Sequence, residues 1–162
     1  VRHALEMAEN LPVKVALSLS DPFCVERHHQ DFNELIRSRV DLLFCNQEEA
    51  FTMMETQVTQ EALAGLSENV ETVVMTLGNR GSLICNQGQI YYIDPIEVEV
   101  VDTTGAGDAY AAGFLYGFSH DQSIMNCGRI ASVMAGTVIE QIGPRIETAS
   151  MKTLKERLTN IP

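Results

Sequence analysis

One stretch decides the fold prediction for this chain: Val101-Asp102-Thr103-Thr104-Gly105-Ala106-Gly107-Asp108. It follows an alternating, strand-like segment over 96–101 and leads into a helix of small residues predicted over 106–118. A glycine turn at the start of a helix presents backbone N–H groups that lack a helical partner, and the helix dipole adds positive potential there. Such a turn is an anion site, and phosphate is its usual occupant.

Asp108 places a carboxylate in the same anion site. Because a carboxylate repels a bound phosphate, a site that only binds phosphate would avoid one. A site that must also take a proton from an attacking hydroxyl needs one. The first helical turn keeps such a carboxylate ionised, as a proton acceptor must be. The alternative is that Asp108 only stabilises the N-terminus of its helix.

The rest of the chain alternates short apolar strands with helices. Strands are predicted over 13–19, 40–45, 72–77 and 97–101, and a hairpin over 82–86 and 89–93; helices are predicted over 4–10, 25–38, 47–54, 59–66, 106–118, 121–141 and 150–158. This alternation predicts an α/β fold with a mostly parallel sheet and helices on both faces. Since ligands of such sheets bind beyond the carboxyl ends of the strands, we expect segments 46–49, 78–81 and 105–108 to share one rim.

Charge and composition exclude several classes of partner. The 162 residues carry a net charge of −11, which disfavours nucleic acid and anionic membranes because phosphate contacts need clustered Lys and Arg. No apolar stretch is long enough to span a membrane. The cysteines form no C-x-x-C pair and lie in or beside apolar segments, as buried free thiols do: Cys24, Cys45, Cys85 and Cys127. The sequence therefore predicts a cytoplasmic protein without a membrane or nucleic-acid partner.

Three segments, in the same order, resemble the motifs of the ribokinase-like (PfkB) carbohydrate and nucleoside kinases. Residues 102–110 (DTTGAGDAY) are similar to the family's C-terminal signature, residues 46–49 to its N-x-x-E motif, and residues 76–81 to its nucleotide-binding turn. The resemblance extends from residue 13 to residue 145. It implies the ribokinase-like three-layer sandwich and an ATP-dependent kinase that phosphorylates a hydroxyl of a sugar or nucleoside.

The resemblance gives the glycine turn its chemistry. It implies that Asp108 is the catalytic base, and that Gly105, Ala106 and Gly107 form the anion hole for the transferred phosphoryl group. Without the resemblance the same residues would form a tight turn into a helix. A dinucleotide-binding G-x-G-x-x-G motif is disfavoured because Tyr110 stands where its third glycine would be, and no Walker-type G-x-x-x-x-G-K-[ST] string is present.

The other two motifs would bind the nucleotide and its metal. The resemblance implies that Glu49 holds Mg²⁺ through water and that Asn46 lies near the phosphates. Alternatively, Asn46 is the N-cap of a helix and Glu49 occupies the third helical position, as in a capping box. Both interpretations can hold at once. Thr76, Gly78 and Gly81 are implied to contact the phosphates and ribose of ATP. Alternatively, Gly78 only ends a strand and Gly81 only opens the hairpin.

Two further sites follow from the resemblance alone. Ala131 and Ala135 are implied to line the adenine site, although their helical spacing is that of core packing. A monovalent-cation site, with K⁺ as the candidate, is an open alternative to a plain turn after the strand. Its implied ligands are Asp102, Thr104, Val138, Gln141 and Gly143.

The extent of the chain bears on its activity. Family members are longer, and their N-terminal half supplies most of the acceptor pocket and a small β lid. We therefore expect residues 1–162 to form a single α/β domain, the C-terminal ATP-binding part of a longer kinase, with the N-terminal acceptor and lid part absent. Residues 19–23 and 140–145 resemble those of adenosine kinase-like members more than those of ribokinases or fructokinases, and this resemblance implies an adenosine kinase-like acceptor. A ribokinase- or fructokinase-type sugar kinase and an inactive nucleotide-binding fragment are the alternatives. The expected partner is a small sugar or nucleoside, and a homodimer is compatible with the sequence.

Overall fold

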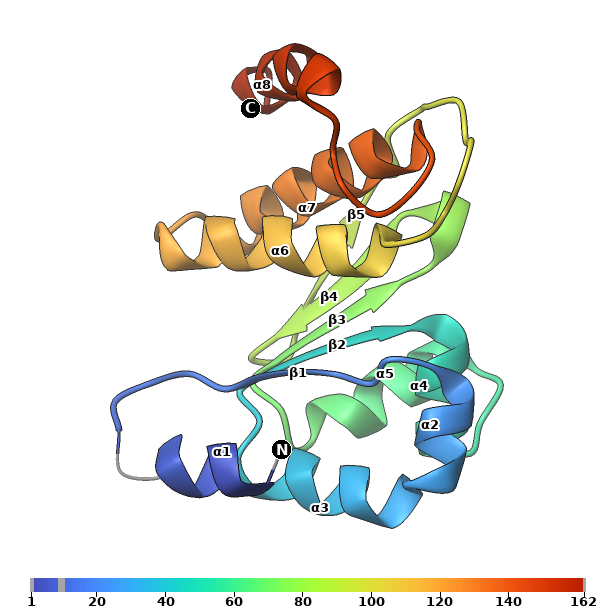
Figure 1. Cartoon of the computed structure of the whole chain (residues 1–162). Coiled ribbons are helices and arrows are strands. Elements are labelled where there is room, and N and C mark those ends of the chain that lie inside the picture. Colours follow the sequence, from blue (N-terminus) through green and yellow to red (C-terminus); the bar gives the residue numbers. More distant parts are fainter. Residues whose placement is uncertain (1, 9–10, 162) are drawn as a thin grey trace. The chain divides into compact units, whose positions relative to one another are not determined.

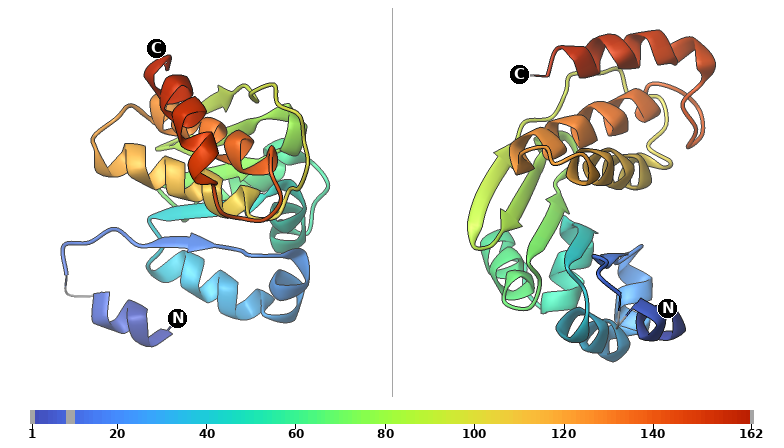
Figure 2. Two further views of the ribbon diagram at one scale, coloured as in Figure 1. Left: turned by 45° about the horizontal axis from the view of Figure 1, so that its top comes forward. Right: turned by 90° about the vertical axis from the view of Figure 1, so that its left-hand side faces the viewer.

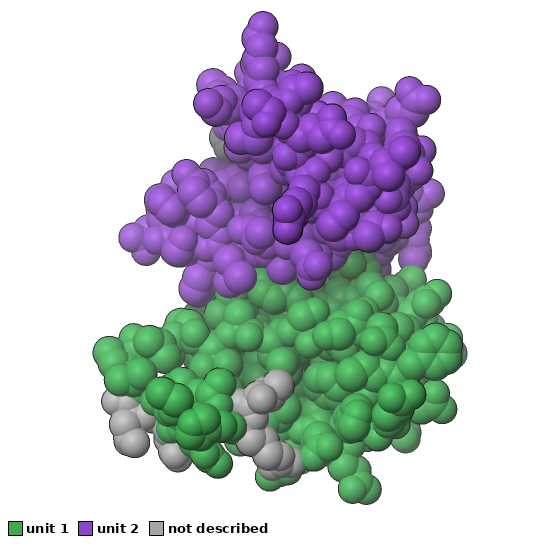
Figure 3. Space-filling model, in the orientation of Figure 1, with its two compact units in different colours: residues 1–76, 84–90 green, residues 77–83, 91–162 purple. Residues whose placement is uncertain are grey.

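The computed structural model describes residues 2–8 and 11–161 (Figure 1). The chain divides into two compact units, coloured separately in Figure 3. Unit 1 comprises residues 1–76 and 84–90, and unit 2 comprises residues 77–83 and 91–162. Hydrogen-bonded strands follow the order β1-β2-β3-β4-β5, so the α/β fold predicted from the sequence is confirmed.

Unit 1 contains the parallel strands of the sheet. They are β1 (Ala16–Ser18), β2 (Leu42–Asn46) and β3 (Thr72–Thr76), and β2 is parallel to both of its neighbours. The first four residues of β2 and of β3 are all buried, the pattern of strands covered on both faces. The helices of this unit are α1 (Arg2–Ala8), α2 (Pro22–Arg27), α3 (His29–Ser38), α4 (Gln47–Met54) and α5 (Thr59–Ser67). Contacts of α4 with β2 and of α5 with β3 help to bury these strands.

The helix predicted over 25–38 is two helices in the structure. The carboxylate of Asp21 caps α2 by accepting a hydrogen bond from the Cys24 N–H, and Pro22 occupies the first helical turn, where it is well tolerated. His28 then leaves the helical region, with φ −120° and ψ 27°, and separates α2 from α3. The apolar spacing revealed the buried face but not this break.

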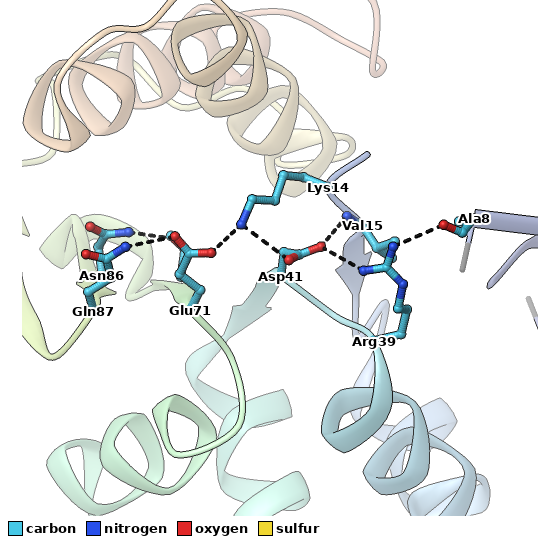
Figure 4. A network of polar contacts seen from close by, with 9 residues as sticks. Ala8, Lys14, Val15, Arg39, Asp41, Glu71, Asn86 and Gln87 are labelled. Carbon is cyan, nitrogen blue, oxygen red and sulfur yellow. Dashed lines mark hydrogen bonds and ion pairs between the residues drawn. The ribbon is translucent and has the colours of Figure 1, made fainter. Parts of the chain in front are cut away.

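A network of polar contacts joins the segments that enter the parallel strands (Figure 4). The ammonium group of Lys14 contacts the carboxylates of Asp41, at 3.4 Å, and of Glu71. Asp41 also accepts the Val15 N–H at 2.7 Å and pairs with Arg39 at 3.8 Å. Hydrogen bonding to Lys14 lowers the pKa of Glu71. These residues precede β1, β2 and β3, so the network ties together the amino ends of the strands.

The hairpin predicted over 82–93 is confirmed. Strands β4 (Ser82–Asn86) and β5 (Gln89–Ile93) are joined by Gln87 and Gly88, whose φ angles of 49° and 81° are those of a type I′ turn. A two-residue connection of this type makes the two strands antiparallel.

Unit 2 is built around two packed helices, α6 (Ala106–Ser119) and α7 (Ile124–Ile139), which lie side by side in both views of Figure 2. A Cβ on Gly113 would lie 2.8 Å from Cα of Ala131, and one on Gly117 would lie 3.1 Å from Cα of Cys127. Glycine therefore permits the close approach. Because residues later in α6 meet residues earlier in α7, the helices are antiparallel, and the first turn of α6 lies beside the last turn of α7.

The remaining elements of unit 2 are η1 (Gly78–Arg80), η2 (Thr148–Ser150) and α8 (Met151–Thr159), and α8 contacts α7. Within residues 2–8 and 11–161, none of the helices combines the length and the apolarity that a membrane span requires.

The strand predicted over 97–101 is wrong. The structure has no strand or helix between β5 and α6, and the amides of Val101 and Asp102 donate to the carbonyl of Ile139 at the end of α7. A Cβ on Gly136 would lie 2.2 Å from Cδ1 of Ile96 and 3.5 Å from Cγ1 of Val98. The apolar alternation thus belongs to an extended segment that packs on a helix rather than in the sheet.

Candidate active site

The glycine turn before α6 has the geometry of an anion site. Gly105 is the N-cap, with φ 81° and ψ 3° in the left-handed region. The Ala106 N–H closes the turn on the carbonyl of Thr103 at 3.1 Å, and the Ala109 N–H makes the first helical bond, to Gly105, at 2.9 Å. The amides of Gly107 and Asp108, in the first turn, have no partner within the helix. They are available to an anion at the positive end of the helix dipole.

The two glycines of this turn have different surroundings. A Cβ on Gly105 would lie 2.5 Å from Cβ of Pro144 and 2.8 Å from its Cα, so both the positive φ and the close approach require glycine. A Cβ on Gly107 would meet no atom within 4 Å. The structure therefore leaves open space at Gly107, where a ligand can approach the backbone.

Asp108 lies in the first turn of α6, and its side chain is exposed. A carboxylate that acts as a base must be accessible to the substrate hydroxyl whose proton it takes, and a position in the core would have excluded that role. The assignment as catalytic base stays a prediction that this exposure permits.

The second carboxylate of the motif, Asp102, is held by three hydrogen bonds. Its Oδ1 accepts from the N–H and the hydroxyl of Thr104, at 2.9 and 2.7 Å, and its Oδ2 accepts from the Gly143 N–H at 2.9 Å. These donors, Thr104 first, lower the pKa of Asp102. Asp102 thus connects the glycine turn to the loop that follows α7.

The predicted cation ligands lie on this turn, in the last turn of α7 and on the loop that follows it. Val138 is buried at the end of α7, and its carbonyl accepts the Gln141 N–H at 3.3 Å. Gly143 adopts φ 86° at the point where it meets Asp102. Within the described parts of the chain, no group of three or more His, Cys, Asp and Glu side chains could hold a metal ion. Backbone carbonyls and one carboxylate suit a weakly bound K⁺, which remains a prediction.

Asn46 and Glu49 form a reciprocal cap at the start of α4, as one of the two sequence interpretations predicted. Asn46 Oδ1 accepts the Glu49 N–H at 2.8 Å, while the carboxylate of Glu49 accepts from the Asn46 backbone N–H at 2.9 Å and from its side-chain amide at 2.7 Å. Glu49 is buried, and burial raises its pKa, with the charges of Asp21 and Glu48 adding to the effect.

This cap also fits a water-bound magnesium ion. A carboxylate offers about four acceptor positions, so the two bonds from Asn46 leave Glu49 able to accept from water. Mg²⁺ usually keeps several waters and uses one or two carboxylates together with substrate phosphates. The residues present thus suit magnesium shared with a phosphate better than a cage made of protein ligands alone.

The nucleotide-binding turn is divided between the units. Thr76 ends β3 opposite Asn46 of β2, so these two predicted residues are register partners within unit 1. In unit 2, Gly78 is exposed with φ 62°, and a Cβ there would meet nothing within 4 Å. Gly81 is buried with φ 81°, and a Cβ there would lie 2.0 Å from the Ile93 carbonyl oxygen. Gly81 therefore has a structural reason to be glycine, as the hairpin alternative predicted.

The two alanines predicted beside the adenine differ in position. Ala131 has no exposed surface and lies against Gly113 in the contact between α6 and α7, where it packs between helices. Ala135, one turn later, is half-buried. Helical spacing correctly indicated packing for Ala131.

Two features of the site escaped the sequence analysis. The helix cap at Asp21, whose charge acts on Glu49, was not predicted, although Asp-Pro after an apolar run signals the start of a helix. Pro144, which contacts the glycine turn, gave no local signal because its partner Gly105 lies far away in the sequence.

The chain is similar in sequence and in structure to known sugar and adenosine kinases. The chain is 32% identical, over 120 residues, to an uncharacterized sugar kinase of Archaeoglobus fulgidus, and this match covers 74% of the chain and 48% of the relative. Among solved structures, the adenosine kinase from Sinorhizobium meliloti has 38% identity and a TM-score of 0.90, with 96% of this chain and 48% of that chain covered. A probable sugar kinase from Rhizobium etli has 37% identity and a TM-score of 0.90, with 95% and 47% covered.

This chain thus spans about half the length of the proteins it resembles. The family model of the pfkB carbohydrate kinases matches residues 1–150, which include all three motifs. Because this match extends over most of the chain, the chain belongs to the PfkB family of carbohydrate kinases.

Proposed function

We propose that this chain is the ATP-binding part of a kinase that transfers the γ-phosphoryl group of ATP to a hydroxyl of a sugar or nucleoside. The observation that carries the proposal is the turn before α6, where open space at Gly107 and unpaired first-turn amides lie beside the exposed carboxylate of Asp108. An anion site next to a reachable base is what phosphoryl transfer to a hydroxyl requires.

Each group then has a defined task. The amides of the turn bind the oxygens of the transferred phosphoryl group and offset the charge that develops on them. Asp108 accepts the proton of the acceptor hydroxyl as its oxygen bonds to phosphorus. Mg²⁺, when bound, neutralises phosphate charge, and Glu49 would hold it through water. Thr76 and Gly78 would contact the nucleotide, and Asp102 with the carbonyls of segment 138–143 would hold K⁺.

For the acceptor, we propose a nucleoside of the adenosine type. The support is the 38% identity to the Sinorhizobium meliloti adenosine kinase over 96% of this chain. A sugar acceptor is the second candidate, favoured by the similar match to the probable sugar kinase of Rhizobium etli. Four free cysteines, three of them buried, fit a reducing compartment such as the cytoplasm.

The test has two parts. Titration calorimetry of this chain with ATP and Mg²⁺ measures nucleotide binding, with Gly107→Leu as the variant that fills the open space. Binding that the leucine abolishes supports the proposed site, whereas binding that is equal in both proteins places ATP elsewhere. The longer protein is then assayed with ATP against adenosine, ribose and fructose. Turnover that is fastest with a sugar would reject the nucleoside acceptor.

A further inference from the structure

The loop after α7, residues 140–147, is closed by one side chain. The amide nitrogen of Gln141 donates to the carbonyl of Arg145, and its oxygen accepts from the Glu147 N–H at 3.1 Å and from the Ser150 hydroxyl at 3.2 Å. The loop has no regular secondary structure before η2, and these three bonds connect Gln141 to residues further along it.

The same loop holds the glycine turn at two points. The Gly143 N–H binds Asp102, whose other oxygen binds the Thr104 N–H, so one carboxylate links the loop to the turn. One residue on, Pro144 packs so closely on Gly105 that a single added carbon would overlap it. The loop therefore restricts the positions that the turn can take.

We propose that Gln141 is a positioning residue for the anion hole. Its amide keeps the 140–147 loop against Asp102 and Gly105, and the loop in turn fixes the backbone N–H groups at the start of α6. Such donors stabilise a developing charge only if they are already oriented when it appears. Because the side-chain oxygen of Gln141 already accepts two hydrogen bonds, its task is to hold the loop, and any contribution to a cation site would come from its backbone.

Amide hydrogen exchange of this chain without ligand tests whether Gln141 orders the glycine turn. In Gln141→Ala, the protected amides of Thr104, Ala106 and Ala109 should exchange about tenfold faster, since loss of several loop bonds of typical strength allows local opening. Cys127→Ala is the control for general destabilisation, because it loosens the α6–α7 contact at the opposite end of the helix pair. It should leave these three amides unchanged relative to the rest of unit 2.

The effect on the ligand is tested by comparing ATP with adenosine, which lacks phosphates. This part rests on the proposed function. Gln141→Ala should weaken ATP binding about tenfold and adenosine binding by less than twofold, because only phosphate contacts depend on oriented amides. Gln141→Glu keeps the acceptor for Glu147 and Ser150 and should lie between alanine and wild type. The exposed Gln122→Ala, at the other end of the helix pair, should match wild type.

The outcomes separate the two proposals. Unchanged exchange at the turn in Gln141→Ala, or equal loss of ATP and adenosine affinity, would overturn the positioning role. If wild type binds no ATP, the proposed function fails, and the exchange experiment still decides whether Gln141 orders the turn. If the alanine variant does not fold, the glutamate variant provides both measurements.

Discussion

Replacing Gly105 with alanine should destabilise unit 2, whereas the same change at Gly107 should not. At Gly105 the left-handed φ of 81° costs a residue with a side chain about 1 kcal/mol. The new Cβ would also lie 2.5 Å from Cβ of Pro144, where carbon contacts are about 3.5–4.0 Å. The loop must move by roughly 1 Å, and overpacking of this kind typically costs about 1–3 kcal/mol. Together, the backbone cost and the overpacking cost should lower the free energy of unfolding of unit 2 by about 2–4 kcal/mol.

Gly107 is the matched control, two residues along the same turn. It is helical, and a Cβ there would contact nothing within 4 Å. Alanine should therefore raise the stability by about 0.5–1 kcal/mol, because it restricts the unfolded chain more than glycine does. The same methyl group would occupy the space proposed for phosphate, so ATP binding should weaken although the protein is more stable.

Tyrosine fluorescence during urea unfolding measures these changes in unit 2 alone. The chain has no tryptophan, and its four tyrosines all belong to that unit: Tyr91, Tyr92, Tyr110 and Tyr116. Titration calorimetry with ATP and Mg²⁺ measures the ATP affinity of the same variants. A loss below about 0.5 kcal/mol at Gly105, the usual range of surface changes, would refute the argument from Pro144. A Gly107→Ala variant that is more stable and binds ATP as well as wild type would refute the assignment of the open space.

Three further measurements test the acidic groups. In the longer protein, Asp108→Asn should cut turnover by about 10²–10⁴-fold with little change in ATP affinity, and a loss below tenfold would remove Asp108 from the base role. Burial raises the pKa of Glu49 above the ordinary glutamate pKa of about 4.3. The Mg²⁺-dependent part of ATP binding should therefore begin to decline at a pH above that value as the pH falls. Calorimetry at several pH values should show this decline in the control variant Glu48→Gln but not in Glu49→Gln. Hydrogen bonding to Arg157 lowers the pKa of Glu140, so that pair should stabilise unit 2 above pH 4.3 by at most about 1 kcal/mol, and lose this as pH falls through the lowered pKa. The stabilities of Glu140→Gln and wild type, measured by urea unfolding, should therefore differ at pH 7 and converge as the pH falls below the lowered pKa of Glu140. A difference that stays constant with pH would contradict the argument.

Local patterns predicted the elements whose stability is itself local. The apolar runs that end near Asn46 and Thr76 predicted the carboxyl ends of β2 and β3 to within one residue. These runs are recognisable because strands buried on both faces are continuously apolar. The cap of α4 was predictable because its partners lie three residues apart. The hairpin was predicted from Gln87-Gly88 between two apolar runs, because glycine readily adopts the positive φ that the second turn position requires.

The failures have a common physical cause. The segment 97–101 alternates like a strand, but its partner is Gly136 of α7, and alternation alone does not distinguish a sheet from a helix as the packing surface. The contact of Pro144 with Gly105 joins segments that are distant in the sequence. Such long-range contacts decide how the site is held together, and a single sequence does not display them.

The two aspartates of the signature motif show how partners, rather than residue type, separate their roles. Asp102 accepts three hydrogen bonds from Thr104 and Gly143, and these bonds lower its pKa. A carboxylate so well satisfied is a poor proton acceptor, because protonation would break bonds that the charged form makes. Asp108 is exposed beside the open space at Gly107. If one of the two takes a proton from a substrate hydroxyl, it must be Asp108, and Asp102→Asn should then disturb the loop and the turn while leaving the pH profile of turnover unchanged.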